Sequence, residues 1–355
     1  MRTLCGILTY IFCFPPVSLL AQPNTDRQIT LDVVVTDKSG APVSGLQEGN
    51  FTVLDNKQPQ KLLSFRAVSG RSAADDPATE IILVLDQINI AHTGVATERD
   101  EIEKFLRRDG ALARPTSMIF LSDLTATMAD KPSQDGNALV ALMNQNLSGL
   151  RVINKAQGVY GAEERLQLSM KAMQNLINYE APRPGRKLVV WLSPGWPFLS
   201  GPGINPSPKQ EQQIFDTIVA LSDGIRKARM TIYAVNPLGV GSSILQTQHY
   251  KEFMKGVRLP RQAQFGNLSL QVLAEQSGGR VLYSSNDVAT EIATCVADAN
   301  AYYELTLDSL AGDDPNEYHA LDIKVDKPGV TVHTRSGYYA QPRAGENAHP
   351  QLRVK

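Results

Sequence analysis

The sequence predicts an α/β protein in which a doubly wound, largely parallel sheet is inserted between two parts of a small β sandwich. Residues 81–85 are five consecutive apolar residues that run directly into Asp86, a pattern typical of a strand covered on both faces. Strand and helix patterns then alternate as far as residue 299, as in a doubly wound domain. Short strands separated by turn residues come before residue 69 and after residue 299, and these indicate the sandwich.

Residues 1–21 have the parts of a secretory signal peptide. Arg2 stands near the start, an apolar stretch covers residues 4–14, and a polar sequence begins after Ala21, where we expect cleavage. The apolar stretch is too short to cross about 30 Å of hydrocarbon, and no second stretch of about 20 apolar residues follows it. We therefore expect a secreted or periplasmic protein without a membrane span.

The composition and the cysteines narrow the class of protein further. The chain carries 35 basic and 36 acidic side chains, for a formal net charge of −1, so it lacks the basic footprint of a nucleic-acid-binding protein. Two of the three cysteines, Cys5 and Cys13, lie in the predicted signal peptide. Cys295 remains alone, and its apolar neighbours Ile292 and Val296 predict a buried core thiol.

Residues 28–68 are predicted to form the first part of the β sandwich. Apolar and polar residues largely alternate over residues 29–35, and turn residues at 37–40 separate this strand from the next segment. About forty residues bury too little apolar surface to be stable alone, so this part needs strands from elsewhere in the chain. The polar residues 69–79 are predicted to be a linker.

Residues 80–299 are predicted to form the α/β domain. Unbroken apolar runs mark its strands, and apolar residues at three- and four-residue spacing mark its helices. The first helix is predicted to begin at Thr97, which can cap it, and residues 236–266 form an insertion with little periodicity. The predicted strands cover residues 81–85, 117–121, 187–192, 231–235 and 280–283, and the predicted helices cover residues 97–108, 137–145, 161–179, 211–228, 267–276 and 287–299.

Residues 300–340 return to a β pattern. Because the first β segment lacks a sufficient core, we expect these C-terminal strands to join it and complete the sandwich. Residues 341–355 form a polar tail without a strand pattern. The predicted C-terminal strands cover residues 302–307, 318–325, 330–334 and 337–340.

Asp86 occupies the position in the chain where a ligand site is most expected. In open α/β sheets ligands bind outside the carboxyl ends of the strands, and Asp86 directly follows the predicted central strand. The alternative is a structural role, in which the carboxylate of Asp86 accepts hydrogen bonds from nearby backbone N–H groups.

Several motifs follow one another in a recognisable order. They are IILVLD (81–86), WLSPG (191–195), SGGRVLYSSND (277–287), YYELTLDS (302–309) and KVDKPGVTVHTRSGYYA (324–340). Together with the first β segment they resemble the bacterial VWFA-related domain family of acidobacterial type. The resemblance covers residues 28–340 and implies a Rossmann-like sheet of the von Willebrand factor type A kind.

The resemblance also implies where a metal-ion-dependent adhesion site would lie. In that fold Asp-x-Ser-x-Ser follows the first strand, and a threonine and a second aspartate come from later loops. This chain keeps the first acid as Asp86, but Ile88 and Ile90 occupy both serine positions. Residues 157–164 contain no threonine, and Ser193 stands where the later aspartate is expected.

This residue set predicts a vestigial site without a cofactor. Mg²⁺ is held by near-octahedral oxygen coordination that offsets its costly dehydration, and one carboxylate with one hydroxyl supplies too few ligands. Weak Mg²⁺ binding at Asp86 is the alternative, if Asn89, Glu163 or Glu164 contributes a further oxygen.

Two other features after the strand at 187–192 are candidates for function. Ser193 lies in a sequence that superficially resembles a nucleophile elbow, but Trp191 stands where that motif requires glycine. Trp196 belongs to an apolar loop, residues 196–199, at the same sheet edge as Asp86. This loop either presents an aromatic anchor to a partner or folds back over the sheet.

These observations predict a secreted, non-catalytic, protein-binding or adhesion-type protein. Its partner is expected to be another protein or a surface polymer, and its oligomeric state is not indicated by the sequence. The rim of the vestigial site is predicted to comprise Asp86, Asn89, Ser193 and Trp196. One alternative is a structural or assembly subunit of a cell-envelope complex, and a second is a serine hydrolase that uses Ser193.

Overall fold

The computed structural model describes residues 28–70, 78–90, 92–108, 110–122, 126–128, 131–147, 158–199, 205–239, 249–283 and 285–342. The predicted signal peptide and most of the predicted linker and tail lie outside these residues.

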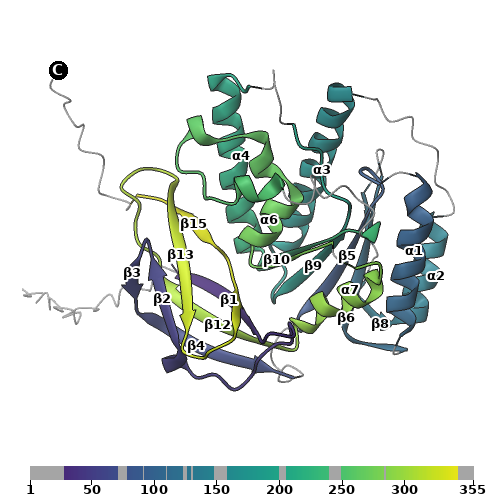
Figure 1. The fold of residues 1–355 in the computed structure, drawn as a ribbon, viewed down its shortest axis with the longest axis horizontal. Coiled ribbons are helices and arrows are strands. Elements are labelled where there is room, and N and C mark those ends of the chain that lie inside the picture. The colour runs from purple at the N-terminus through teal and green to yellow at the C-terminus, as the bar shows by residue number, and fades with distance from the viewer. Residues whose placement is uncertain are drawn as a thin grey trace, which may run out of the picture.

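A largely parallel sheet forms the centre of the molecule (Figure 1). Its strand order is β11-β10-β9-β5-β6-β7, and β8 also pairs with β6. The strand β5 pairs in parallel with both β6 and β9, whereas β7 and β8 run antiparallel to β6. The strands are β5 (Glu80–Asp86), β6 (Ala111–Leu121), β7 (Ala126–Met128), β8 (Ser133–Asp135), β9 (Lys187–Leu192), β10 (Met230–Val235) and β11 (Val281–Leu282).

Helices cover both faces of this sheet, which explains the unbroken apolar run in β5. Ile82 and Val84 pack into the core under α3, α4 and α6, whereas Ile81, Leu83 and Leu85 pack into the core under α1, α2 and α7 (Figure 1). The helices are α1 (His92–Arg107), α2 (Gly136–Leu147), α3 (Gly158–Glu180), α4 (Pro208–Lys227), α6 (Leu270–Gln276) and α7 (Val288–Ala297).

Two antiparallel sheets of four strands each stand beside the α/β part. Their orders are β14-β1-β12-β4 and β15-β13-β2-β3, so each combines strands from the beginning and the end of the chain. Leu31 in β1, for example, pairs with Leu305 in β12. The strands are β1 (Gln28–Thr36), β2 (Phe51–Asp55), β3 (Gln58–Gln60), β4 (Leu62–Ser69), β12 (Ala301–Asp308), β13 (Glu317–Val325), β14 (Thr331–His333) and β15 (Gly337–Ala340).

The pairing of β1 with β12 and of β2 with β13 confirms the predicted fold class. Neither terminal segment could bury its apolar face alone, and together they enclose one core that includes Leu31, Val53, Leu305 and Ile323. The α/β part is therefore an insertion between two parts of a β sandwich.

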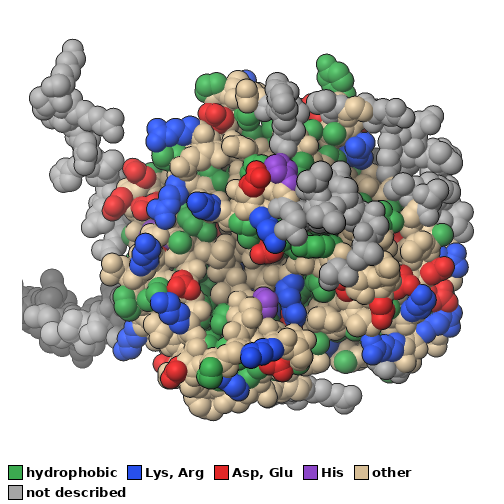
Figure 2. Space-filling view, in the orientation of Figure 1, with side chains coloured by type: hydrophobic (Ala, Val, Ile, Leu, Met, Phe, Trp, Pro, Cys, Tyr) green, Lys and Arg blue, Asp and Glu red, His purple; other side chains and the backbone are tan. Residues whose placement is uncertain are grey.

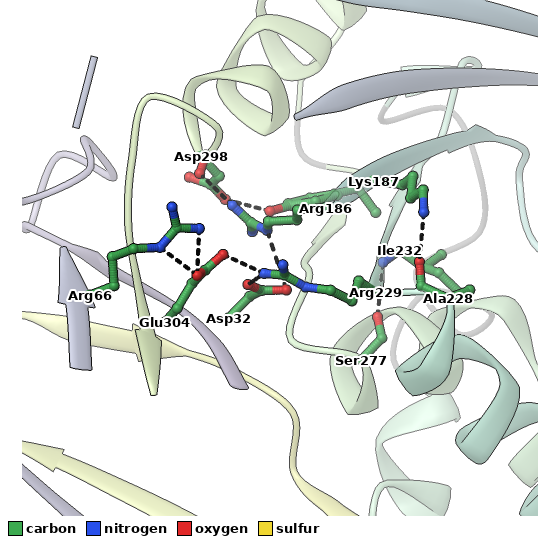
Figure 3. Close-up of polar contacts among 11 residues, drawn as sticks. Asp32, Arg66, Arg186, Lys187, Ala228, Arg229, Ile232, Ser277, Asp298 and Glu304 are labelled. Atoms are coloured by element: carbon green, nitrogen blue, oxygen red, sulfur yellow. Dashed lines mark hydrogen bonds and ion pairs between the residues drawn. The ribbon is translucent and has the colours of Figure 1, made fainter. Parts of the chain in front are cut away.

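A network of charged side chains joins the sandwich to the α/β part (Figure 3). Arg229, just after α4, bonds Asp32 of β1 and Glu304 of β12, at 2.5 Å in each case. Glu304 also accepts from Arg66 of β4, and Arg186 lies 3.9 Å from Asp32. Although burial alone would raise it, the pKa of Glu304 lies below its ordinary value because Arg229 and then Arg66 bind the carboxylate.

Two further predictions concern burial and the membrane. Cys295 is fully buried in α7, as predicted, and burial raises the pKa of its thiol well above the ordinary value. None of the helices in the described part of the chain is long and apolar enough to cross a membrane. On the face drawn in Figure 2, basic and acidic side chains are interspersed.

Candidate functional site

The carboxylate of Asp86 lies fully buried at the end of β5 and is surrounded by protein donors. Its Oδ1 accepts the backbone N–H groups of Ile88 at 3.0 Å and Asn89 at 3.2 Å. Its Oδ2 accepts the Nδ2 of Asn89 at 2.8 Å and the indole Nε1 of Trp191 at 3.1 Å. Four N–H groups therefore donate hydrogen bonds to the carboxylate. Through these bonds Asp86 holds the turn after β5 in place.

These residues do not fit a bound Mg²⁺ ion. The side chains at the two positions where the resemblance implies serine, Ile88 and Ile90, are buried and offer no oxygen. Glu163 and Glu164 are exposed on α3. Within the described residues, no three His, Cys, Asp or Glu side chains come together as metal ligands would. A cation at Asp86 would have to displace hydrogen bonds that hold the turn, at a cost the remaining ligands cannot offset.

Asn89 connects this turn to α3. Besides Asp86, its Nδ2 donates to the Oγ of Ser169 at 2.9 Å, and that hydroxyl donates to the carbonyl of Arg165 at 2.8 Å. Ser169 is fully buried, and the sequence reasoning missed it. One feature of the sequence could have indicated Ser169: it is a hydroxyl side chain between Leu166 and Met173 on the apolar face of α3.

Trp196 folds back over the sheet. Of the two alternatives for its loop, the prediction that it presents an exposed aromatic anchor was wrong for this residue. Only 2% of Trp196 is exposed, and its ring packs edge-on against Trp191 with 5.3 Å between the ring centroids. Phe198 remains half-buried and packs against His249 and Phe253. Trp191 thus links Trp196 to Asp86, a connection that the sequence did not predict.

Ser193 lies at the same edge of the sheet as Asp86, because Leu85 of β5 pairs with Leu192 of β9. Its hydroxyl is buried and accepts the N–H of Gly195 at 3.2 Å. Among the residues that the structure describes, no histidine or lysine side chain hydrogen-bonds to this hydroxyl. The described residues therefore do not pair the hydroxyl of Ser193 with a histidine or lysine that could act as its general base.

A pocket of about 570 Å³ opens beside this cluster, and we call it the edge pocket. It lies beyond the carboxyl ends of β5 and β9, where α/β sheets bind ligands. Gly195 has a φ of +116°, and a Cβ there would lie 2.3 Å from the Nε2 of Gln271, so this wall requires glycine. The lining residues are Asn89, Arg165, Pro194, Gly195, Trp196, Pro197, Phe198, His249 and Gln271.

Glu98 is a second buried acid near Asp86. It is 1% exposed, and neither of its carboxyl oxygens has a hydrogen-bond partner among the described residues. Burial, and then the negative charge of Asp86, raise the pKa of Glu98 well above its ordinary value. The sequence predicted that this helix begins at Thr97, but α1 begins at His92, so Glu98 lies beyond the first turn of the helix and is buried.

Comparisons with known proteins find similar solved structures but no related sequence. No protein-family model matches the chain, and no curated protein matches it. The manganese-loaded TRAP protein of Plasmodium vivax is similar with a TM-score of 0.37 and 9% identity, covering 77% of this chain and 96% of that one. The human COPII-coat protein Sec24c is similar with a TM-score of 0.30 and 8% identity, covering 74% of this chain and 44% of that one. At such low TM-scores and identities, these similarities carry no argument about the family or the function of this chain.

Proposed function

We propose that this chain is a secreted or periplasmic, non-catalytic binding protein that holds its partner at the carboxyl edge of the parallel sheet without a metal ion. The partner is another protein or a surface polymer, and the chain is proposed to be a member of the bacterial VWFA-related domain family. The observation that carries this proposal is the occupation of the Asp86 carboxylate by four protein donors beside the edge pocket.

The position and the chemistry of the site support this proposal. Ligands of open α/β sheets bind at the carboxyl ends of the strands, and the edge pocket lies there. Its volume of about 570 Å³ is in the range of sites that enclose a side chain or a small ligand. Its walls combine proline and aromatic side chains with the amides of Asn89 and Gln271 and with Arg165 and His249, a mixture of apolar and polar groups that is typical of binding sites.

A photo-cross-linking experiment tests this function. A benzoylphenylalanine residue replaces Phe198 at the edge pocket, and in a matched variant it replaces Tyr179, which is 41% exposed near the far end of α3. After irradiation in the secreted or periplasmic fraction of the native host, we expect a discrete adduct from position 198 and not from position 179. The adduct should form equally in the presence of EDTA.

Other outcomes of this experiment would contradict the proposal. Adducts that EDTA abolishes would indicate a metal-dependent site, and equal adducts from both positions would indicate contact without a specific surface. A stoichiometric complex that survives purification without cross-linking would favour the alternative of an envelope assembly subunit. Labelling of Ser193 by a serine-hydrolase probe, lost in Ser193→Ala, would favour the hydrolase alternative.

A further inference from the structure

Three buried polar atoms at the edge pocket have no hydrogen-bond partner among the described residues. They are the Oδ1 of Asn89, the Oε1 of Gln271 and the Nε1 of Trp196. They come from three separate segments, namely the turn after β5, the helix α6 and the loop after β9. A buried polar group without a partner is costly, and three of them around one pocket point to a ligand that supplies the missing bonds.

Contacts within the protein hold two of these atoms in position. The Nδ2 of Asn89 already donates to Asp86 and Ser169, so the remaining oxygen of that amide is its free acceptor. The ring of Trp196 is fixed by its edge-on contact with Trp191, which orients the indole N–H. Prepositioned groups of this kind lose little entropy when a ligand binds.

The third atom belongs to the amide of Gln271. Its Nε2 lies next to Gly195, and its Oε1 is the acceptor without a partner among the described residues. All three atoms are shielded from solvent in this structure, so a ligand reaches them after side-chain rotation at the pocket wall. Side-chain rotations of this kind are common when an interface forms, and Phe198 is only half-buried.

The set of two acceptors and one donor selects the ligand chemistry. A primary carboxamide offers two N–H donors on one nitrogen and one carbonyl acceptor, and so matches the set. A carboxylate has no donor, an ammonium group has no acceptor, and a single hydroxyl offers only one donor. Pro194, Pro197 and Phe198 provide apolar walls for the methylene groups that carry a side-chain amide.

We propose that the edge pocket receives the side-chain carboxamide of a glutamine or asparagine from the partner protein. The amide nitrogen donates to Asn89 and Gln271, and the amide oxygen accepts from the indole N–H of Trp196. This inference rests on the proposed function, because it assumes that the partner contacts this edge of the sheet.

The two tryptophans of the chain provide a direct test with an internal control. The ¹⁵N-labelled chain is titrated with N-acetylglutamine methylamide, and the two indole N–H signals are followed by NMR. We expect the Trp196 signal to shift in a saturable way, whereas that of Trp191, which is bonded to Asp86, stays in place. The variant Trp196→Phe assigns the signals by deleting one of them.

Matched probes and variants complete the test. N-acetylglutamate methylamide and methyl glucoside should leave the Trp196 signal unchanged. The variant Gln271→Met, which removes one acceptor, should weaken binding about five- to ten-fold, and Gln174→Met, outside the pocket on α3, should not. Thermal unfolding of both variants shows whether they remain folded.

The inference is overturned if the carboxamide shifts neither signal or both alike, or if the glutamate or glucoside probe shifts Trp196 as strongly. A saturable shift from the glucoside alone would assign the pocket to a saccharide. The inference fails alone if the carboxamide does not bind while cross-linking from position 198 succeeds, and the proposed function fails as well if neither is observed.

Discussion

The indole of Trp191 donates a hydrogen bond across 3.1 Å to Oδ2 of Asp86, and both residues are buried at the carboxyl ends of their strands. The two residues are 105 positions apart in the chain and are brought together by the parallel pairing of β5 with β9. The same indole packs edge-on against Trp196. This one side chain thus closes the site where the resemblance implies a metal and supports the wall of the edge pocket.

We expect Trp191→Phe to destabilise the protein by about 2 to 4 kcal/mol, because a buried carboxylate loses a donor and the core loses packing volume. Urea unfolding followed by circular dichroism measures this change. Trp196→Phe is the control, since it keeps the bond to Asp86 and should cost less. An equal loss in both variants would show that the hydrogen bond to Asp86 contributes little.

Isothermal titration with Mg²⁺, Mn²⁺ or Ca²⁺ should give no saturable binding heat. The reason is that four N–H groups of the protein already donate hydrogen bonds to the carboxylate of Asp86. For the same reason EDTA should leave the melting temperature unchanged. Micromolar binding that is lost in Asp86→Ala would contradict this prediction and would establish the weak-ion alternative.

The stability of the protein should depend on pH through Glu98. Its pKa is raised in the folded state, so folding favours the protonated acid, and stability falls as the pH rises above about 4.3, the ordinary glutamate value. The free energy of unfolding should fall by at most about 1.4 kcal/mol per pH unit through this group. Glu98→Gln resembles the protonated acid and should remove this part of the pH dependence.

Urea unfolding of wild type and Glu98→Gln at several pH values checks this prediction. The variant should gain stability relative to the wild type as the pH rises above about 4.3, and the difference should stop growing once the pH passes the raised pKa of the folded state. Exposed Glu163→Gln on α3 is the control and should follow the wild-type curve. Parallel curves for wild type and Glu98→Gln would show that Glu98 titrates normally.

Arg229→Ala should destabilise the protein by about 2 to 4 kcal/mol, because it leaves the carboxylates of Asp32 and Glu304 without their shared partner. The pKa of Glu304 is lowered in the folded state, so its contribution to stability is present above about pH 4.3 and is lost as the pH falls. The difference between wild type and variant should therefore shrink in acid.

A second substitution at this position separates charge from backbone conformation. Arg229 has a φ of +52°, in the left-handed region, which glycine adopts more easily than other residues because it has no Cβ. Arg229→Gly should therefore lose less stability than Arg229→Ala, by about 1 kcal/mol. If the two variants unfold at the same urea concentration, the left-handed conformation imposes no measurable strain.

The fold class could be predicted from local patterns of the sequence. The unbroken apolar run before Asp86 requires cover on both faces of a strand, and the observed helices provide it. Two terminal β segments, each too small to bury a core alone, had to combine, as β1 and β12 do. These inferences rest on periodicity and on apolar burial, which depend on neighbouring residues and on segment size.

The contacts of the site were decided only by the tertiary structure. Nothing near Asp86 in the sequence indicates that Trp191 donates to its carboxylate, that Ser169 accepts from Asn89, or that Glu98 faces the core. The two hydrogen bonds join residues from different elements, and strand pairing and helix packing decide both these partners and the burial of Glu98. The sequence determined which acid stands at the end of the central strand, and the packing of distant elements determined that protein donors surround it.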